Sequence, residues 1–260
     1  MSELTSLHPY DPAFVARYVA AVRGDREDPT LAPAAPHWLE QELTRARRGY
    51  QRAILGEEIG ANQVSYGLGR LLAATEPVYF VPGAGLTQVE ARYDRGLGML
   101  LRPPSRLFAD AGLEISAARA MPIRLDASAG SMGGAYVPPA LVPQFQEMLA
   151  ARLERMAQRM AEGELDAPAL LGVLREAAAD AAARGLGLYE AVDIVVPGVA
   201  ASEPPGLHPV LPDRKRLDRD LRKRLEEAPR PPKEPGLFSR LLGRGEKSRR
   251  PDADAGRRWR

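Results

Sequence analysis

The spacing of the apolar residues changes twice along this chain of 260 residues, and that change limits the folds open to it. Apolar side chains recur every three or four positions in residues 11–54, alternate in much of 76–137, and recur every three or four positions again in 143–185. The first spacing is typical of amphipathic helices and the second of half-buried strands. We therefore predict an α+β fold, an antiparallel sheet over about 76–137 flanked by N-terminal helices and a C-terminal helical hairpin.

Residues at the segment ends predict where the helices begin and end. Asp11 and Pro12 suit the N-cap and first turn of a helix that Gly24 ends, and Pro36 opens a second helix. The segment 143–185 contains two helices separated by a break, which predicts the hairpin. We expect the charged residues of the second helix to form a solvated face: Glu40, Glu42, Arg45, Arg47 and Arg48.

Several short runs in the middle of the chain have the spacing of strands. Two of them lie on either side of residues 83–85, Gly-Ala-Gly, which predicts a strand pair joined by a glycine turn. Further strands are predicted at 97–102, 113–118, 121–125 and 134–137, with a last one at 193–196.

The composition along the chain predicts four successive regions. Residues 1–198 are expected to form a globular α+β domain, 199–211 a Pro/Gly linker, 212–227 a charged helix, and 228–260 a disordered basic tail. From residue 213 onward there are 17 Lys and Arg residues against 9 Asp and Glu, a net charge of +8, whereas the first 212 residues carry 19 against 25, a net charge of −6. Such a division indicates an appended segment with a role of its own.

One apolar island interrupts the basic tail at 236–243, with the sequence GLFSRLLG. On a helix its apolar side chains would share one face, with two arginines elsewhere: Leu237, Phe238, Leu241 and Leu242, then Arg240 and Arg244. Islands of this kind fold into a partner's groove or lie on an anionic membrane surface. We therefore expect a non-enzymatic scaffold or adaptor that docks a protein or membrane-surface partner through the tail. Non-specific nucleic-acid binding by the same basic tail is an alternative.

An unrecognised enzyme is the other alternative, and its least improbable form is a serine-type hydrolase. Residues 129–133, Ala-Gly-Ser-Met-Gly, differ at one position from the nucleophile-elbow motif Gly-x-Ser-x-Gly centred on Ser131, and Asp193 and His208 follow in the chain order of such hydrolases. The double proline at 138–139 argues against the helix that an elbow requires.

An anion-binding or phosphate-binding enzyme is a further form of this alternative. Arginines recur through the predicted sheet region and could line such a site: Arg92, Arg95, Arg102 and Arg106. The general preference of arginine for exposed positions favours a solvated rim instead.

Other classes of function have little support in the sequence. The chain has no cysteine, its three histidines are never three or four residues apart, and no complete nucleotide-binding glycine motif occurs. We expect no metal site and no cofactor. The N-terminal residues do not resemble a signal peptide, and no apolar run approaches the roughly 18–20 residues that span a bilayer, so we expect a soluble cytoplasmic protein. The sequence leaves the oligomeric state open.

Overall fold

The structure, a computed structural model, divides the chain into two compact units, Met1–Ala228 and Pro229–Arg260. It describes the following residues: 4–25, 28–81, 85–86, 93–121, 132–163, 165–195, 203–211 and 223. All of them belong to the first unit, which has the predicted α+β class.

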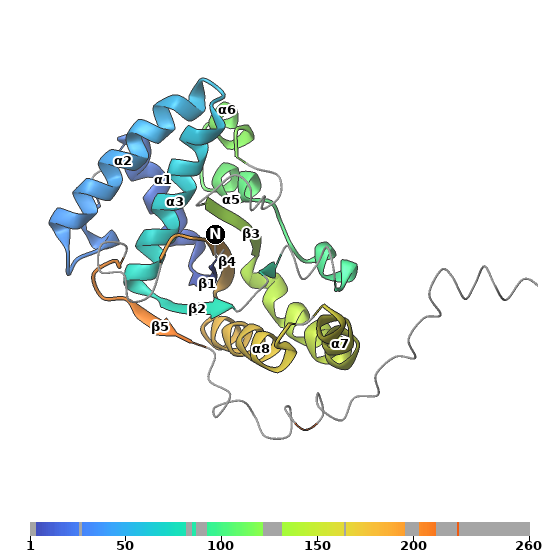
Figure 1. The fold of residues 1–260 in the computed structure, drawn as a ribbon. Coiled ribbons are helices and arrows are strands. Elements are labelled where there is room, and N and C mark those ends of the chain that lie inside the picture. Colours follow the sequence, from blue (N-terminus) through green and yellow to red (C-terminus); the bar gives the residue numbers. More distant parts are fainter. Residues whose placement is uncertain are drawn as a thin grey trace, which may run out of the picture. The chain divides into compact units, whose positions relative to one another are not determined.

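A five-stranded mixed sheet lies at the centre of the described residues (Figure 1). Its strands are β1 (Thr5–Tyr10), β2 (Pro77–Val81), β3 (Met132–Val137), β4 (Gly187–Val192) and β5 (His208–Val210). They are ordered β3-β4-β1-β2-β5, with β1 antiparallel to β2 and β4, β3 antiparallel to β4, and β5 parallel to β2. The prediction of a purely antiparallel sheet within 76–137 is therefore wrong, because three of the five strands come from outside that segment and β5 pairs in parallel.

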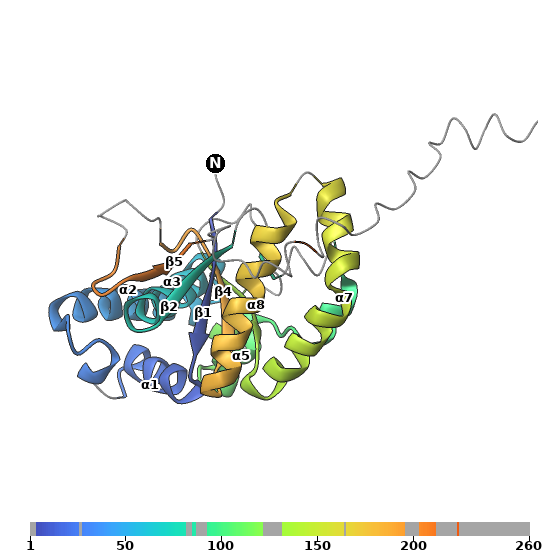
Figure 2. The ribbon, with the colours of Figure 1, turned by 90° about the horizontal axis from the view of Figure 1, so that it is seen from below.

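Helices cover both faces of this sheet (Figures 1 and 2). One group comprises α1 (Pro12–Arg23), α2 (Pro36–Ile54), α3 (Glu58–Thr75), α5 (Pro104–Asp110) and α6 (Ile115–Arg119). The opposite face is covered by α7 (Val142–Glu162) and α8 (Ala167–Arg184). Three 3₁₀ turns complete the described elements: η1 (Pro29–Leu31), η2 (Arg95–Met99) and η4 (Pro139–Leu141).

Alternate strand residues enter two separate hydrophobic cores. In β2, Val78 and Phe80 pack with the group of α1, α2 and α3, whereas Tyr79 and Val81 pack with α7 and α8. All residues of β1 and β4 are buried for the same reason. A strand buried on both faces has no polar side, so its sequence lacks the alternation that identifies a half-buried strand. For this reason β1 was not predicted, and the last predicted strand, 193–196, begins just after the observed β4 at 187–192.

The predicted long helices are confirmed, with the expected caps. The Asp11 side chain accepts a hydrogen bond of 2.9 Å from the backbone N–H of Ala13, and Gly24 ends α1 with a φ of 84°. The second helix begins at Pro36, and the C-terminal hairpin is formed by α7 and α8. The helix α3 was not predicted.

Two predicted strands are helical instead. The segment 97–102 overlaps η2, where Leu97 and Leu100 are buried and Met99 is exposed, which is a three-residue period. The segment 113–118 overlaps α6, which buries Ala117 and Ala118 and exposes Ile115. Alternation over five or six residues does not distinguish a strand from a short turn of helix.

The remaining predictions have mixed outcomes. The strands at 77–81 and 134–137 are confirmed, and residues 208–210, expected in a linker, form β5. Residues 87–92 and 122–125 lie outside the described part of the chain, as does all of the expected helix 212–227 except Lys223.

The helices α2 and α3 pack closely through a pair of glycines. An ideal Cβ built on Gly60 would lie 2.5 Å from the carbonyl oxygen of Gly49 and 2.7 Å from the backbone nitrogen of Ala53. Only a residue without a side chain allows this approach, so these glycines set how near α3 lies to α2.

A buried ion pair joins the same two helices. Glu42 accepts a hydrogen bond of 3.0 Å from Nε of Arg70, and both side chains are less than a tenth exposed. The guanidinium of Arg70 also lies 5.5 Å from the ring centroid of Trp38 and 5.7 Å from that of Tyr66. Glu42 is therefore not part of a solvated face, because Arg70 from α3 compensates its charge within the interface.

His8 is fully buried in the central strand β1. Its Nε2 lies 2.9 Å from the hydroxyl oxygen of Ser6. Burial disfavours the charged imidazolium and lowers the pKa of His8 from 6.5 to about 3. Between these two values the unfolded chain holds a proton at His8 that the folded chain does not.

We predict that His8 contributes to loss of stability in acid. His8 is neutral in both states above pH 6.5 and costs no stability there, but the unfolding free energy falls by up to about 1.4 kcal/mol per pH unit as the pH drops from 6.5 to about 3. His8→Gln should reduce the pH dependence of the unfolding free energy across this window, as measured by urea denaturation at a series of pH values. His37→Gln, at an exposed position of α2, is the control. Equal slopes for wild type and His8→Gln would show that the prediction is wrong.

Candidate functional site

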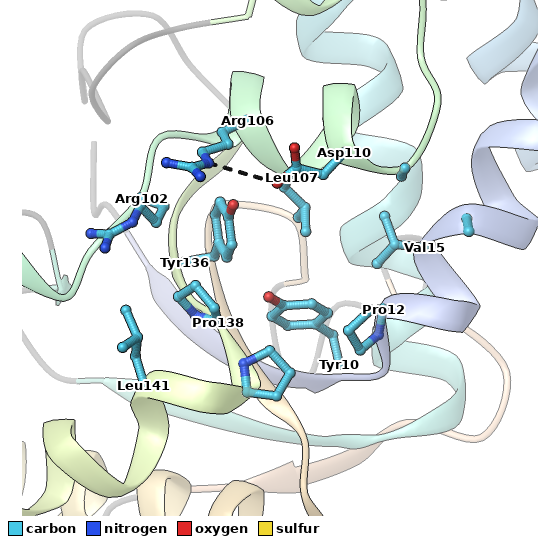
Figure 3. A pocket seen from close by; sticks show the side chains of 13 residues that line it. Tyr10, Pro12, Val15, Arg102, Arg106, Leu107, Asp110, Tyr136, Pro138 and Leu141 are labelled. Atoms are coloured by element: carbon cyan, nitrogen blue, oxygen red, sulfur yellow. Dashed lines mark ion pairs between the residues drawn. The ribbon is translucent and has the colours of Figure 1, made fainter.

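A pocket of about 390 Å³ opens at the end of the sheet where β1 and β3 finish (Figure 3). Three segments far apart in the sequence line it: the end of β1 with the first turns of α1, residues 102–111 around α5, and the end of β3 with η4. We call it the tyrosine pocket, because Tyr10 and Tyr136 contribute its aromatic side chains.

The strand register brings the two tyrosines together. Tyr10 of β1 pairs with Gly187 of β4, and Tyr136 of β3 pairs with Tyr189 of the same strand. The rings of Tyr10 and Tyr136 meet with their centroids 6.0 Å apart and their planes at 78°, a favourable edge-to-face contact.

Gly187 is necessary for this arrangement. An ideal Cβ built on it would lie 2.3 Å from Cε1 of Tyr10 and 2.7 Å from the carbonyl oxygen of Val137. The Tyr10 ring therefore occupies the space that any other residue at position 187 would need.

Two arginines and one aspartate bring charge to the tyrosine pocket. Nε of Arg106 lies 3.7 Å from Oδ2 of Asp110, one turn along α5, and both side chains are exposed. In Figure 3 the hydroxyl of Tyr136 lies beneath this pair. The guanidinium of Arg102 points away from the tyrosines, and its Nη1 donates to the carbonyl oxygens of Met99 and Leu101 at 2.8 and 2.9 Å.

Arg102 is nevertheless held close to Tyr136 by its backbone. Its N–H donates to the carbonyl oxygen of Tyr136 at 2.9 Å, and the N–H of Tyr136 donates back to its carbonyl oxygen at 3.0 Å. This isolated bridge attaches the segment before α5 to β3, and so places the arginines at the pocket.

The two phenols keep their protons at neutral pH. Burial raises the pKa of Tyr10, and Tyr136 and Asp110 raise it further. Burial and Asp110 also raise the pKa of Tyr136 to about 12, although the positive charges of Arg106 and Arg102 act to lower it. The tyrosine pocket therefore offers neutral hydroxyl donors beside a guanidinium, a combination that suits an anion.

The structure brings together only part of the predicted arginine set. Arg102 and Arg106 line the tyrosine pocket, whereas Arg95 is exposed at the start of η2 and does not line it. Arg92 lies outside the described residues.

The structure separates Asp193 from His208. Asp193 follows β4 and holds the start of β1, because its Oδ1 accepts a hydrogen bond of 2.8 Å from the N–H of Leu4. His208 lies in β5, three positions away in the sheet order and level with the opposite end of β2, at Pro77. With about 4.8 Å per strand and 3.3 Å per residue, the two are more than about 14 Å apart. Ser131 lies outside the described residues.

The tail residues expected to bind a partner also lie outside the described part of the chain: Leu237, Phe238, Arg240, Leu241, Leu242 and Arg244. The structure contributes nothing to that prediction beyond the unit boundary at Ala228.

Tyr10, Tyr136 and Asp110 were not among the predicted site residues. A weak signal was present, because each tyrosine stands two residues before a proline that follows its strand, in YDP at 10–12 and YVP at 136–138. Proline stops a strand and can open a helical turn, so this pattern marks an aromatic residue at a strand end. Nothing in the sequence indicates that the two strand ends meet.

Two properties of the described residues bear on the class of site. Among them, no group of three or more His, Cys, Asp or Glu side chains is arranged to hold a metal ion. None of the described helices combines the length and apolar character needed to cross a membrane.

We predict that Gly187→Ala destabilises the fold by about 1–3 kcal/mol, because the new methyl group collides with the buried Tyr10 ring and with backbone. Urea denaturation measures the change. Gly163→Ala is the control, since its Cβ would lie 3.2 Å from its nearest neighbour, the hydroxyl oxygen at the end of Tyr93, and should cost less. A Gly187→Ala protein as stable as wild type would contradict the close approach described above.

Comparisons with known proteins add no relative. No family model, no curated protein sequence and no solved structure matches this chain.

Proposed function

We propose that this chain binds a small anionic molecule in the tyrosine pocket. The observation that carries the proposal is the placement of Arg106 over the hydroxyl of Tyr136 at the edge of a pocket of about 390 Å³. A guanidinium and a neutral phenol both donate hydrogen bonds, and donors attached to a cation are the stronger kind.

The surroundings of these donors support the same function. Tyr10 and Tyr136 are almost fully buried, although their rings line the pocket. Burial lowers the effective dielectric near their hydroxyls, so an anion bound there interacts more strongly with donors than it does in water. Because Tyr136 is held by the β3–β4 register, its hydroxyl is positioned before a ligand arrives.

Asp110 competes with the proposed ligand for Arg106. The two side chains form an exposed i,i+4 pair, which is a weak interaction, so a bound anion can take the place of the Asp110 carboxylate. Asp110 is also the one carboxylate among the described residues that line the pocket, and its pairing with Arg106 suits charge balance better than proton transfer. These features favour binding over catalysis.

We predict that Arg106→Gln weakens binding of small anions by about fivefold to tenfold, because it removes a charge-assisted hydrogen bond at a partly exposed site. Asp110→Asn should strengthen binding by about twofold, since it removes the competing carboxylate. Ligand-observed NMR titrations of phosphate, acetate and benzoate at constant ionic strength measure both effects.

The matched control is Arg95→Gln, which removes an exposed arginine of the same neighbourhood that does not line the tyrosine pocket. It should bind as wild type does. The proposal is wrong if no anion binds saturably, or if Arg106→Gln and Arg95→Gln have the same effect.

Docking through the tail is a second candidate function. It is supported by the net charge of +8 after residue 212, by the apolar island 236–243, and by the compact-unit boundary at Ala228, next to the predicted start of the tail. We propose that Leu237, Phe238, Leu241 and Leu242 are the anchors, and that the partner is a protein groove or an anionic membrane surface.

We predict that a chain ending at Glu227 folds with nearly unchanged stability and loses its partner. Leu241→Asp in the full-length chain should have the same effect on binding, because a carboxylate in an apolar groove is strongly unfavourable. Ser239→Asp adds the same charge away from the apolar residues and is the control. Flotation with anionic vesicles and pull-down assays measure binding.

A different result would identify nucleic acid as the partner. In that case Leu241→Asp would matter little, and removal of the terminal arginines would flatten the salt dependence of binding: Arg249, Arg250, Arg257, Arg258 and Arg260. Wild-type binding by the chain ending at Glu227 would exclude the tail as the docking element.

A further inference from the structure

The size of the tyrosine pocket indicates a ligand larger than an inorganic anion. Its volume of about 390 Å³ falls in the range of small-molecule sites. An inorganic oxyanion, with the bulk of three or four water molecules, would fill about a third of it. A ligand that uses the whole pocket therefore has an organic body in addition to its charged group.

The walls that would contact this body are largely carbon. Apart from the charged residues and the tyrosine hydroxyls, they consist of aliphatic side chains and prolines, among them Pro12, Val15, Leu107, Pro138 and Leu141. Figure 3 shows the ring of Tyr10 between Pro12 and Pro138, with its hydroxyl on the side of Tyr136. Flat aromatic and proline rings at such angles are suited to hold another flat ring by stacking and edge contacts.

The charges at the pocket indicate that the ligand carries one negative charge. Among the described residues that line it, Arg102 and Arg106 are cationic and Asp110 is anionic, which leaves a net charge of +1. A dianion would place its second negative charge near Asp110, and no further cation among the described lining residues would offset it. A carboxylate is a monoanion whose two oxygens match the fork of a guanidinium.

We propose that the ligand of the tyrosine pocket is a small aromatic monocarboxylic acid. Its ring lies against Tyr10, Tyr136 and the proline walls, and its carboxylate displaces Asp110 from Arg106. This inference rests on the proposed anion-binding function and specifies its ligand class.

The test compares ligands that differ only in the ring or only in the charge. Benzoate should bind the full-length chain at least about tenfold more tightly than acetate, since the ring removes apolar surface from water. Phenyl phosphate, largely a dianion at pH 7.5, should bind no more tightly than benzoate. Ligand-observed NMR titrations at constant ionic strength measure all three dissociation constants.

A variant that fills the tyrosine pocket separates the ring contribution from the charge contribution. Ala16 lines the pocket from the exposed side of α1, so Ala16→Trp should weaken benzoate binding at least about tenfold and acetate binding much less. Ala13→Trp, at an exposed position of α1 that does not line the pocket, is the matched control and should leave both unchanged.

The outcomes distinguish this inference from the proposed function. If acetate or phosphate binds as tightly as benzoate and Arg106→Gln still weakens binding, the anion site stands and the aromatic ligand class is wrong. Tighter binding of phenyl phosphate than of benzoate overturns the monocarboxylate. If none of the anions binds saturably, the proposed function itself fails.

Discussion

Strand β1 is covered on both faces, by the α1–α3 group on one and by α8 on the other, so water reaches none of its side chains. Its polar residues must find partners inside the protein: His8 contacts Ser6, and Asp193 holds the N–H of Leu4 at the start of the strand. The neighbouring strands β4 and β2 then take their register from β1. Because each register position sends a side chain into one core or the other, a slip of one residue would exchange the two cores.

The same register creates the tyrosine pocket. Tyr10 is the last residue of β1 and lies over Gly187 of β4, and Tyr136 approaches from β3 on the other side of β4. The fold thus places two buried phenols at a sheet end, where the chain turns outward into α1 and η4. Arg106 completes the site from α5. The backbone bridge between Arg102 and Tyr136 attaches the segment before α5 to β3 and so holds this helix at the pocket. The pocket is therefore a consequence of strand pairing. Its geometry also depends on Gly187, because the missing side chain leaves the space that the Tyr10 ring occupies.

Part of this site was accessible to sequence reasoning. Arg102 and Arg106 belonged to the predicted anion-binding set because arginine suits anions wherever it clusters. The sequence offered no way to separate them from Arg95, since all three have similar local surroundings. Tyr10 is separated from Tyr136 by 125 intervening residues, and their contact requires β4, a strand whose predicted position was several residues too late. Contacts of this range are set by sheet order, which no local pattern encodes.

Local residue patterns were sufficient to predict the α+β class, the long helices α1, α2, α7 and α8, and several of their caps, because helical spacing and capping chemistry act over a few residues. The composition of the sheet depends on contacts between residues far apart in the chain. The sheet includes β1, whose residues are polar as often as apolar, and β5, which lies in a proline-rich stretch. Tertiary contacts also bury Glu42, because Arg70 of α3 pairs with it. Burial on both faces removes the polar–apolar alternation from β1, whereas β5 is a three-residue edge strand, too short to show such a pattern. Burial between α2 and α3 lets Arg70 compensate the charge of Glu42, which looks solvated in the sequence.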